Sequence, residues 1–170
     1  MARVAERRAR ALAPIPLFAS AALAGRVVTR VLEASGAKGE AWLGPLAAGR
    51  IATLAWVEDA GPSDPARTLS GEKRIVLDGP VAERFFVVAR LPGTRGEQGL
   101  GLFAVEADAA GLAVERQEAF DITRTLARLR FTDVEAIAVG QPGEDGPAIR
   151  RGLEEATVLL CAELVGGMQR

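Results

Sequence analysis

The chain has 170 residues, 49% of them apolar, and its 21 basic and 22 acidic side chains leave a formal net charge of −1. Such a length and apolar fraction suit a protein with a real core and argue against disorder, which needs low hydrophobicity and high net charge. The sequence holds no His, no Tyr and a single Cys. A His-dependent catalytic triad, a His/Cys zinc site and an intrachain disulfide are therefore excluded.

The near-neutral charge gives no long-range attraction to nucleic acid or to an anionic membrane, so neither is expected as a partner. No apolar run reaches the roughly 20 residues that span a bilayer. Segment 1–10 is basic and segment 11–24 is apolar, which is the order of a signal peptide. Glu6, Pro14 and Pro16 interrupt that pattern and favour a soluble helical segment instead. We expect the protein in the cytoplasm, whose reducing conditions suit a lone cysteine.

The first 50 residues have the apolar spacing of helices, which we expect over 3–12, 17–34 and 40–48. Pro14 and Pro16 separate the first two helices. Gly36 stands where a helix commonly ends on a left-handed glycine.

From residue 51 the pattern becomes that of short strands separated by turns. We expect strands over 51–56, 74–77, 84–91, 101–107, 112–118 and 126–132. The strand 84–91 is apolar on both faces and should be buried. A series of this kind is typical of an antiparallel β-barrel or sandwich.

A linker rich in Gly and Pro at 141–146 precedes a second helical region. From residue 148 onward, apolar residues recur every three or four positions: Ile149, Leu153, Ala156, Leu160 and Leu164. The predicted fold class is therefore α+β, with a helical N-terminal segment, an antiparallel β-barrel or sandwich in the middle and a C-terminal helix. We place the boundaries of these parts at 1–50, 51–142 and 143–170.

Few side chains outside the middle segment are candidates for chemistry. Three arginines share strand parity and could meet a phosphate, although a solvated sheet face is the more ordinary explanation: Arg124, Arg128 and Arg130. Three glutamates of the last helix fit surface or interface positions better than a general base: Glu154, Glu155 and Glu163. Cys161 fits a small core residue, since no His is available to activate it.

The most informative segment is 51–79. A strand there leads into the turn VEDAGPSD at 57–64, and the run SGEKRIVLDG follows at 70–79. A turn of this kind at a strand edge presents backbone N–H groups and a Ser hydroxyl in one place, which suits the polar edge of a planar ligand or a phosphate. An ordinary turn between strands is the alternative.

In their order along the chain and in their residues, these segments resemble those of the acyl-CoA dehydrogenase family. The turn at 57–64 has the spacing of the family's Thr-Glu-Pro-(Gly)-x-Gly-Ser-Asp turn, and 70–79 is similar to its Gly-x-Lys-x-(Phe/Trp)-Ile-x-x-Gly strand. Other segments resemble, in chain order, a joint between N-terminal helices, the helix leading into the β domain, two later β-domain strands and the first long helix of the C-terminal domain: 11–20, 42–50, 101–111, 127–134 and 162–170.

The resemblance implies a flavoprotein oxidoreductase of fatty acid metabolism. In that family a carboxylate removes the α-proton of an acyl-CoA thioester while the β-hydrogen leaves as hydride to FAD, and neither step needs His or Tyr. The three parts become a partial N-terminal helical domain (1–50), a middle β domain (51–142) and the first helix of a C-terminal helical domain (143–170). Ser63 is the one position carried over as a contact to the cofactor or the CoA ester.

The departures from the family pattern are equally specific. Val57 stands where the family commonly has a flavin-contacting Thr. Ile75 replaces the frequent aromatic residue that flanks the flavin, and Leu77 replaces a Thr that hydrogen-bonds its edge. The interval 65–69 is too short for the family's usual first hairpin, and Thr157 stands where an Arg is often seen.

The chain has about half the length of a family member, and the family's catalytic glutamate has no counterpart in it. We therefore predict no catalytic residue and no metal ligand.

Two functions stay open. The first is an acyl-CoA dehydrogenase-like flavoprotein, as a fragment or as a subunit that binds FAD and acyl-CoA with a partner; the retained Ser63 and Asp64 allow it. The alternative is a non-catalytic, degenerate assembly subunit that does not bind flavin, which the losses at 57, 75 and 77 favour. In either case the apolar helical faces predict a homo- or hetero-oligomer.

Overall fold

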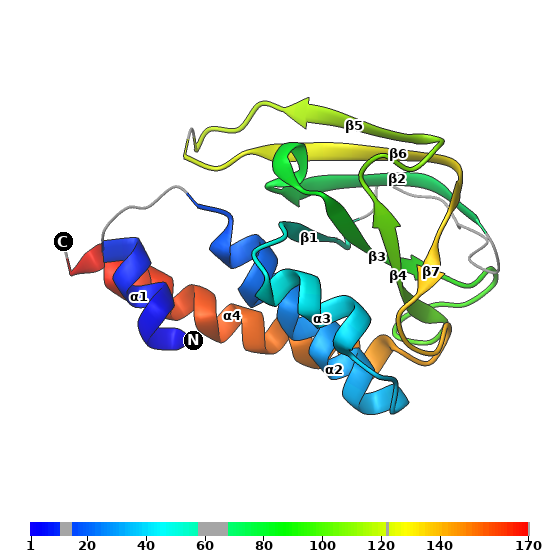
Figure 1. Ribbon diagram of the computed structural model, residues 1–170, viewed down its shortest axis with the longest axis horizontal. Helices are drawn as coiled ribbons and strands as arrows, with labels where there is room; N and C mark the ends of the chain where they lie inside the picture. The colour runs from blue at the N-terminus through cyan, green and yellow to red at the C-terminus, as the bar shows by residue number, and fades with distance from the viewer. Residues whose placement is uncertain (11–14, 58–67, 122, 170) are drawn as a thin grey trace.

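The computed structural model describes residues 1–10, 15–57, 68–121 and 123–169, and in it helices cover one side of a pair of facing β-sheets (Figure 1). This is the predicted α+β class, with helical segments at both ends of the chain and the strands between them. None of the described helices is long and apolar enough to cross a membrane.

The N-terminal helices lie close to the predicted ranges. They are α1 (Ala2–Arg10), the π-helical η1 (Phe18–Ala24), α2 (Gly25–Ser35) and α3 (Glu40–Ala47). The residues flanking the junction of η1 and α2 keep helical dihedral angles, so the two together form the helix expected over 17–34. Gly36 ends α2 with φ 68°, the left-handed conformation predicted for it.

The first sheet has four strands in the order β1-β3-β4-β7. Its members are β1 (Ala52–Ala55), β3 (Arg84–Arg90), β4 (Leu100–Glu106) and β7 (Ile137–Ala138). β1 and β3 are parallel, which differs from the all-antiparallel expectation. The difference arises because the chain between them passes through the other sheet and returns in the same direction.

The second sheet is antiparallel, with three strands in the order β2-β6-β5. They are β2 (Thr68–Leu77), β6 (Leu126–Glu135) and β5 (Leu112–Gln117), and the 3₁₀ turn η2 (Gly79–Val81) links β2 to β3. Both sheets are open, so the middle of the chain is a sandwich and not a closed barrel.

The strand β3 belongs to two cores at once. Phe86 and Val88 pack with α2, η1 and the C-terminal helix α4 (Gly146–Met168), in what we call the helix-side core. Phe85 and Val87 point the other way and pack between the two sheets. This confirms the prediction that the strand is buried on both faces.

The packing of α4 differs from the prediction. The helix lies against α1 and α2 (Figure 1) through small residues, with Gly152 on the backbone of Val27 and Gly166 on the backbone of Glu6. Close approach of two helix backbones needs positions without a Cβ, so the buried face follows these glycines. Consequently Leu160, Leu164 and Cys161 are exposed, and the prediction that Cys161 lies in the core is wrong.

Two glycines of α4 provide a matched test of this contact. A Cβ at Gly152 would lie 2.6 Å from the Val27 Cα, whereas a Cβ at Gly167 would meet nothing within 4 Å. We expect Gly152→Ala to lower the free energy of unfolding by about 1–3 kcal/mol through overpacking. Gly167→Ala should be neutral or stabilise by up to about 1 kcal/mol through helix propensity. Urea denaturation measures both, and equal effects would contradict the described contact.

Candidate functional site

Three segments that are distant in sequence meet where β1 ends. The N–H of Arg74 on β2 donates to the carbonyl oxygen of Val57, just beyond β1, at 3.0 Å. The N–H of the next residue, Ile75, donates to Oε1 of Gln117 at the end of β5, also at 3.0 Å. The structure thus bonds Val57 to Arg74, the residue before Ile75, so that two of the positions that the sequence singled out lie one residue apart in this bonding pattern.

These contacts arise from a β-bulge in β2. The register with β6 shifts between Lys73 and Val76, so that Arg74 and Ile75 together lie opposite the single residue Arg128. Ile75 has φ 56°, a left-handed conformation that is a genuine outlier for a β-branched residue.

Apolar surface accompanies the bulge. Ile75 is 56% exposed and Trp56 is 47% exposed. Trp56 precedes Val57, which is half-buried. We call Trp56, Val57 and Ile75 the apolar patch. An exposed apolar surface beside convergent backbone groups is a typical place for a planar ligand.

Leu77 is arranged differently from the other two replaced positions. Its side chain packs against the helix-side core. Its carbonyl oxygen accepts a 2.6 Å hydrogen bond from Oγ1 of Thr53, a fully buried residue of β1. This bond joins the two sheets close to the bulge. The sequence analysis missed Thr53, although a hydroxyl inside the apolar run 51–56 is a signal that could have drawn attention to it.

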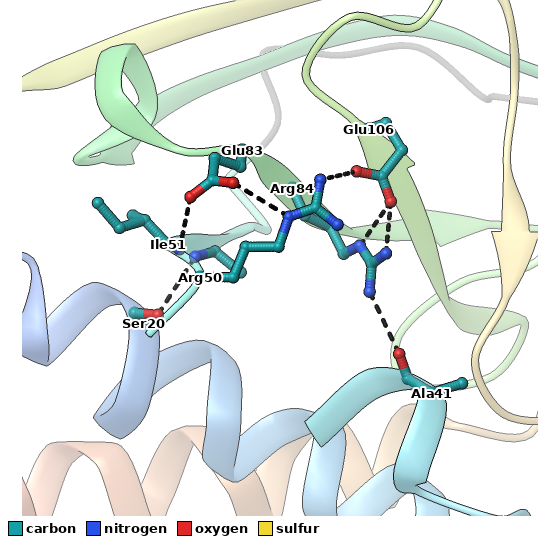
Figure 2. Close-up of polar contacts among 8 residues, drawn as sticks. Ser20, Ala41, Arg50, Ile51, Glu83, Arg84 and Glu106 are labelled. Carbon is teal, nitrogen blue, oxygen red and sulfur yellow. Dashed lines mark hydrogen bonds and ion pairs between the residues drawn. The ribbon is translucent and has the colours of Figure 1, made fainter. Parts of the chain in front are cut away.

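A network of ion pairs fixes the beginning of β1 (Figure 2). Arg50, which precedes the strand, pairs with Glu83 at 3.2 Å and with Glu106 at 2.7 Å. Arg84 donates through Nε to the same Glu106 at 2.7 Å and lies over the ring of Trp42 on α3. The strand is therefore held at its start by Glu83, just before β3, and by Glu106 at the end of β4, while its other end forms the candidate site.

A polar hollow of about 400 Å³ lies at the end of β5 and includes Gln117, the residue that accepts the N–H of Ile75. It is lined by Arg116, Gln117, Glu118, Ala119, Asp121, Arg124 and Thr125. Hydrogen bonds from the Thr123 hydroxyl, at 2.6 Å, and from its N–H lower the pKa of Asp121. Asp121 and Thr123 are thus joined by local bonds on one side of the hollow.

Arg124 connects this hollow to the helices. Its guanidinium pairs with Glu163 of α4 and lies 5.6 Å from the ring centroid of Phe18 on η1. It therefore ties the β-sheet loop to two helical elements. No sequence pattern pairs Arg124 with Glu163, because the contact joins residues 39 positions apart.

The other candidate charges form ion pairs at partly or fully exposed positions, whereas Glu163, expected at the surface or at an interface, is buried against Arg124. Arg128 meets Glu72 at 2.8 Å and Arg130 meets Glu115 at 3.2 Å on the solvated face of the second sheet. On α4, Glu154 pairs with Arg150 at 3.3 Å. Glu155 accepts from Arg30 of α2 at 2.6 Å, and this hydrogen bond lowers the pKa of Glu155.

Two predicted positions add nothing to this geometry. Ser63, together with the rest of the turn from 58 to 67, lies outside the described residues. The Thr157 hydroxyl donates to the Leu153 carbonyl oxygen within α4 at 2.9 Å. The candidate site is thus defined by the bulge and by the ends of β1 and β5.

Comparisons with known proteins agree with the sequence resemblance. No family model matches the chain. The probable acyl-CoA dehydrogenase FadE10 of Mycobacterium tuberculosis is 36% identical over 89 residues, a match that covers 44% of this chain and 14% of that protein.

Solved structures match nearly the whole chain. A structure of PigA with FAD and proline superposes with TM-score 0.83 at 24% identity, covering 99% of this chain and 49% of that one. A putative acyl-CoA dehydrogenase from Mycobacterium smegmatis gives TM-score 0.79 at 25% identity, with coverage of 99% and 49%. Butyryl-CoA dehydrogenase from Megasphaera elsdenii gives 0.77 at 21% identity, with coverage of 97% and 47%.

The protein thus has the fold of the acyl-CoA dehydrogenases, with the candidate site in its β-sandwich. The matches confirm the resemblance to that family which the sequence predicts. The chain spans about half the length of the solved structures it matches.

The bond between Thr53 and Leu77 can be tested with two equivalent substitutions. Thr53→Val keeps the shape but removes the donor from a buried carbonyl group, and we expect it to lower the free energy of unfolding by about 1–3 kcal/mol. Thr157→Val makes the same change on the exposed face of α4 and should stay within about 0.5 kcal/mol of wild type. Both values come from denaturant unfolding, and a Thr53→Val protein as stable as wild type would contradict the role given to this bond.

Proposed function

We propose that this chain is the β-domain part of an acyl-CoA dehydrogenase-like flavoprotein, with residues 51–142 as the middle β domain. Residues 1–50 correspond to part of an N-terminal helical domain and residues 143–170 to the first helix of a C-terminal one. The observation that carries the proposal is the bulge at Arg74 and Ile75, which bonds to Val57 beyond the end of β1, within a fold shared with a PigA structure that contains FAD.

The described residues fit one side of a flavin ring. The apolar patch offers Trp56 and Ile75 as exposed surface for a planar ring to pack on. Side-chain hydrogen bonds from positions 57, 75 and 77 are not available, because Val, Ile and Leu stand there. Ring packing would therefore provide the contact on this side, and Ser63 remains our proposed polar contact from the turn at 57–64.

Bound FAD would supply the hydride acceptor for dehydrogenation of an acyl-CoA thioester. We assign no residue of this chain as the base that removes the α-proton. A partner, or further sequence of a longer protein, would provide that carboxylate. The proposed role of this chain is to bind and orient the ring and to keep water from one of its faces.

A second candidate is a non-catalytic subunit that keeps the fold for assembly. The packing of Leu77 into the helix-side core favours it, since no polar side chain is presented from that position. The two candidates differ in whether the chain binds flavin.

Flavin binding can be measured on the purified protein at saturating FAD. We expect a flavin absorbance band that co-elutes with the protein, and Ile75→Glu should weaken binding at least tenfold by placing a carboxylate in the apolar patch. Ile137→Glu is a matched control, because Ile137 on β7 is 65% exposed. A colourless wild-type protein would overturn the flavoprotein proposal and leave the assembly subunit.

We also propose that the outer face of α4 is covered in the assembled protein, by a second copy or by a partner of helical structure. Its exposed apolar residues are Val158, Leu160, Leu164, Val165 and Met168. Such a cluster on one helix face is typical of an interface.

Light scattering and binding of an apolar dye test this association. We expect an oligomer for the wild type and a shift toward monomer for Leu164→Glu, which places a charge at a residue that is 60% exposed. Ile137→Glu should leave the mass unchanged. A monodisperse wild-type monomer with low dye binding would contradict the proposed association.

A further inference from the structure

Gln117 makes a contact that the sheet itself does not provide. It is the last residue of β5, and β6 lies between β5 and β2. Its side-chain oxygen nevertheless accepts the N–H of Ile75 on β2, at 3.0 Å. The side chain therefore reaches across the intervening strand to the bulge.

The group that it satisfies belongs to the most strained described position of the site. Ile75 has φ 56°, and a β-branched residue keeps such a conformation only where its surroundings hold it there. Two hydrogen bonds do so: Arg74 N–H to the Val57 carbonyl oxygen and Ile75 N–H to Gln117. The first comes from the neighbouring backbone, and the second depends on one side chain.

We propose that Gln117 is a positioning residue, whose side-chain oxygen keeps Ile75 left-handed and thereby sets the apolar patch for a planar aromatic ring. Gln117 acts through Ile75, and its effect on ring binding is indirect. The identity of the ring as a flavin rests on the proposed function above, while the effect of Gln117 on Ile75 does not.

The conformational part is tested by NMR on the ligand-free protein. The intraresidue NOE between the Ile75 amide proton and Hα is strong only at positive φ. Amide hydrogen exchange at Ile75 reports the hydrogen bond. We expect Gln117→Ala to weaken that NOE and to accelerate exchange about tenfold, in line with the loss of one hydrogen bond.

Two variants provide the controls. Gln117→Glu retains an acceptor oxygen and should preserve both the NOE and the slow exchange. Glu115→Ala alters another residue of β5, whose side chain pairs with Arg130 at 3.2 Å and is not part of the polar hollow, and should do the same. If Gln117→Ala leaves the NOE and the exchange rate of Ile75 unchanged, the proposal is overturned.

The ligand part is tested by titrating FAD into the same variants. We expect Gln117→Ala to bind FAD several-fold more weakly than wild type, and Gln117→Glu and Glu115→Ala to bind within about twofold of it. Unchanged affinity in Gln117→Ala, with Ile75 released, would overturn the positioning role. If the wild type binds no FAD, the proposed function fails, and the NMR result alone still decides whether Gln117 holds Ile75.

Discussion

The structure depends on the burial of β3 from both sides. Alternate residues of this one strand, Phe85 and Val87 against Phe86 and Val88, supply the inter-sheet core and the helix-side core. If the helices separate from the first sheet, one face of β3 is exposed to water. If the second sheet separates from the first, the other face is exposed. The site inherits its geometry from this arrangement, since β1 is the parallel neighbour of β3.

The second constraint is local and concerns which acceptors the backbone N–H groups of β2 bond to. At the bulge of β2, two donors leave the ladder, and each finds an acceptor outside it, in Val57 and in Gln117. These two acceptors link the end of β1 and the end of β5 to β2. A break in one hydrogen-bond pattern thereby connects three strands from two sheets.

Much of the fold could be predicted from the sequence, because apolar spacing is a local property. The helix ending at Gly36 and the two-faced strand at 84–91 follow directly from residue order. The parallel pairing of β1 with β3 could not be predicted in this way, since it depends on the path of the chain through the other sheet. The buried face of α4 was also missed, because close backbone contact selected Gly152 and Gly166 over the larger Leu160 and Leu164.

The candidate site also has a part that the sequence could predict and a part that it could not. The resemblance drew attention to Val57 and Ile75, and the structure bonds Val57 to Arg74, the residue before Ile75. It gave no indication of Thr53 or Gln117, whose partners lie 24 and 42 positions away in the chain. Side-chain hydrogen bonds between residues so far apart produce no repeating pattern in the sequence, so only the folded structure shows them.

The glycine contacts of α4 have a further consequence for assembly. With Gly152 seated on the backbone of Val27, the helix cannot roll about its axis without a clash. Its outer apolar residues are therefore held at a fixed angle to the sheets before any partner arrives. In the proposed association, this side of the interface would therefore lose little conformational entropy. Gly152 and Gly166 would thus favour binding at the outer face of α4, although both lie on its inner face.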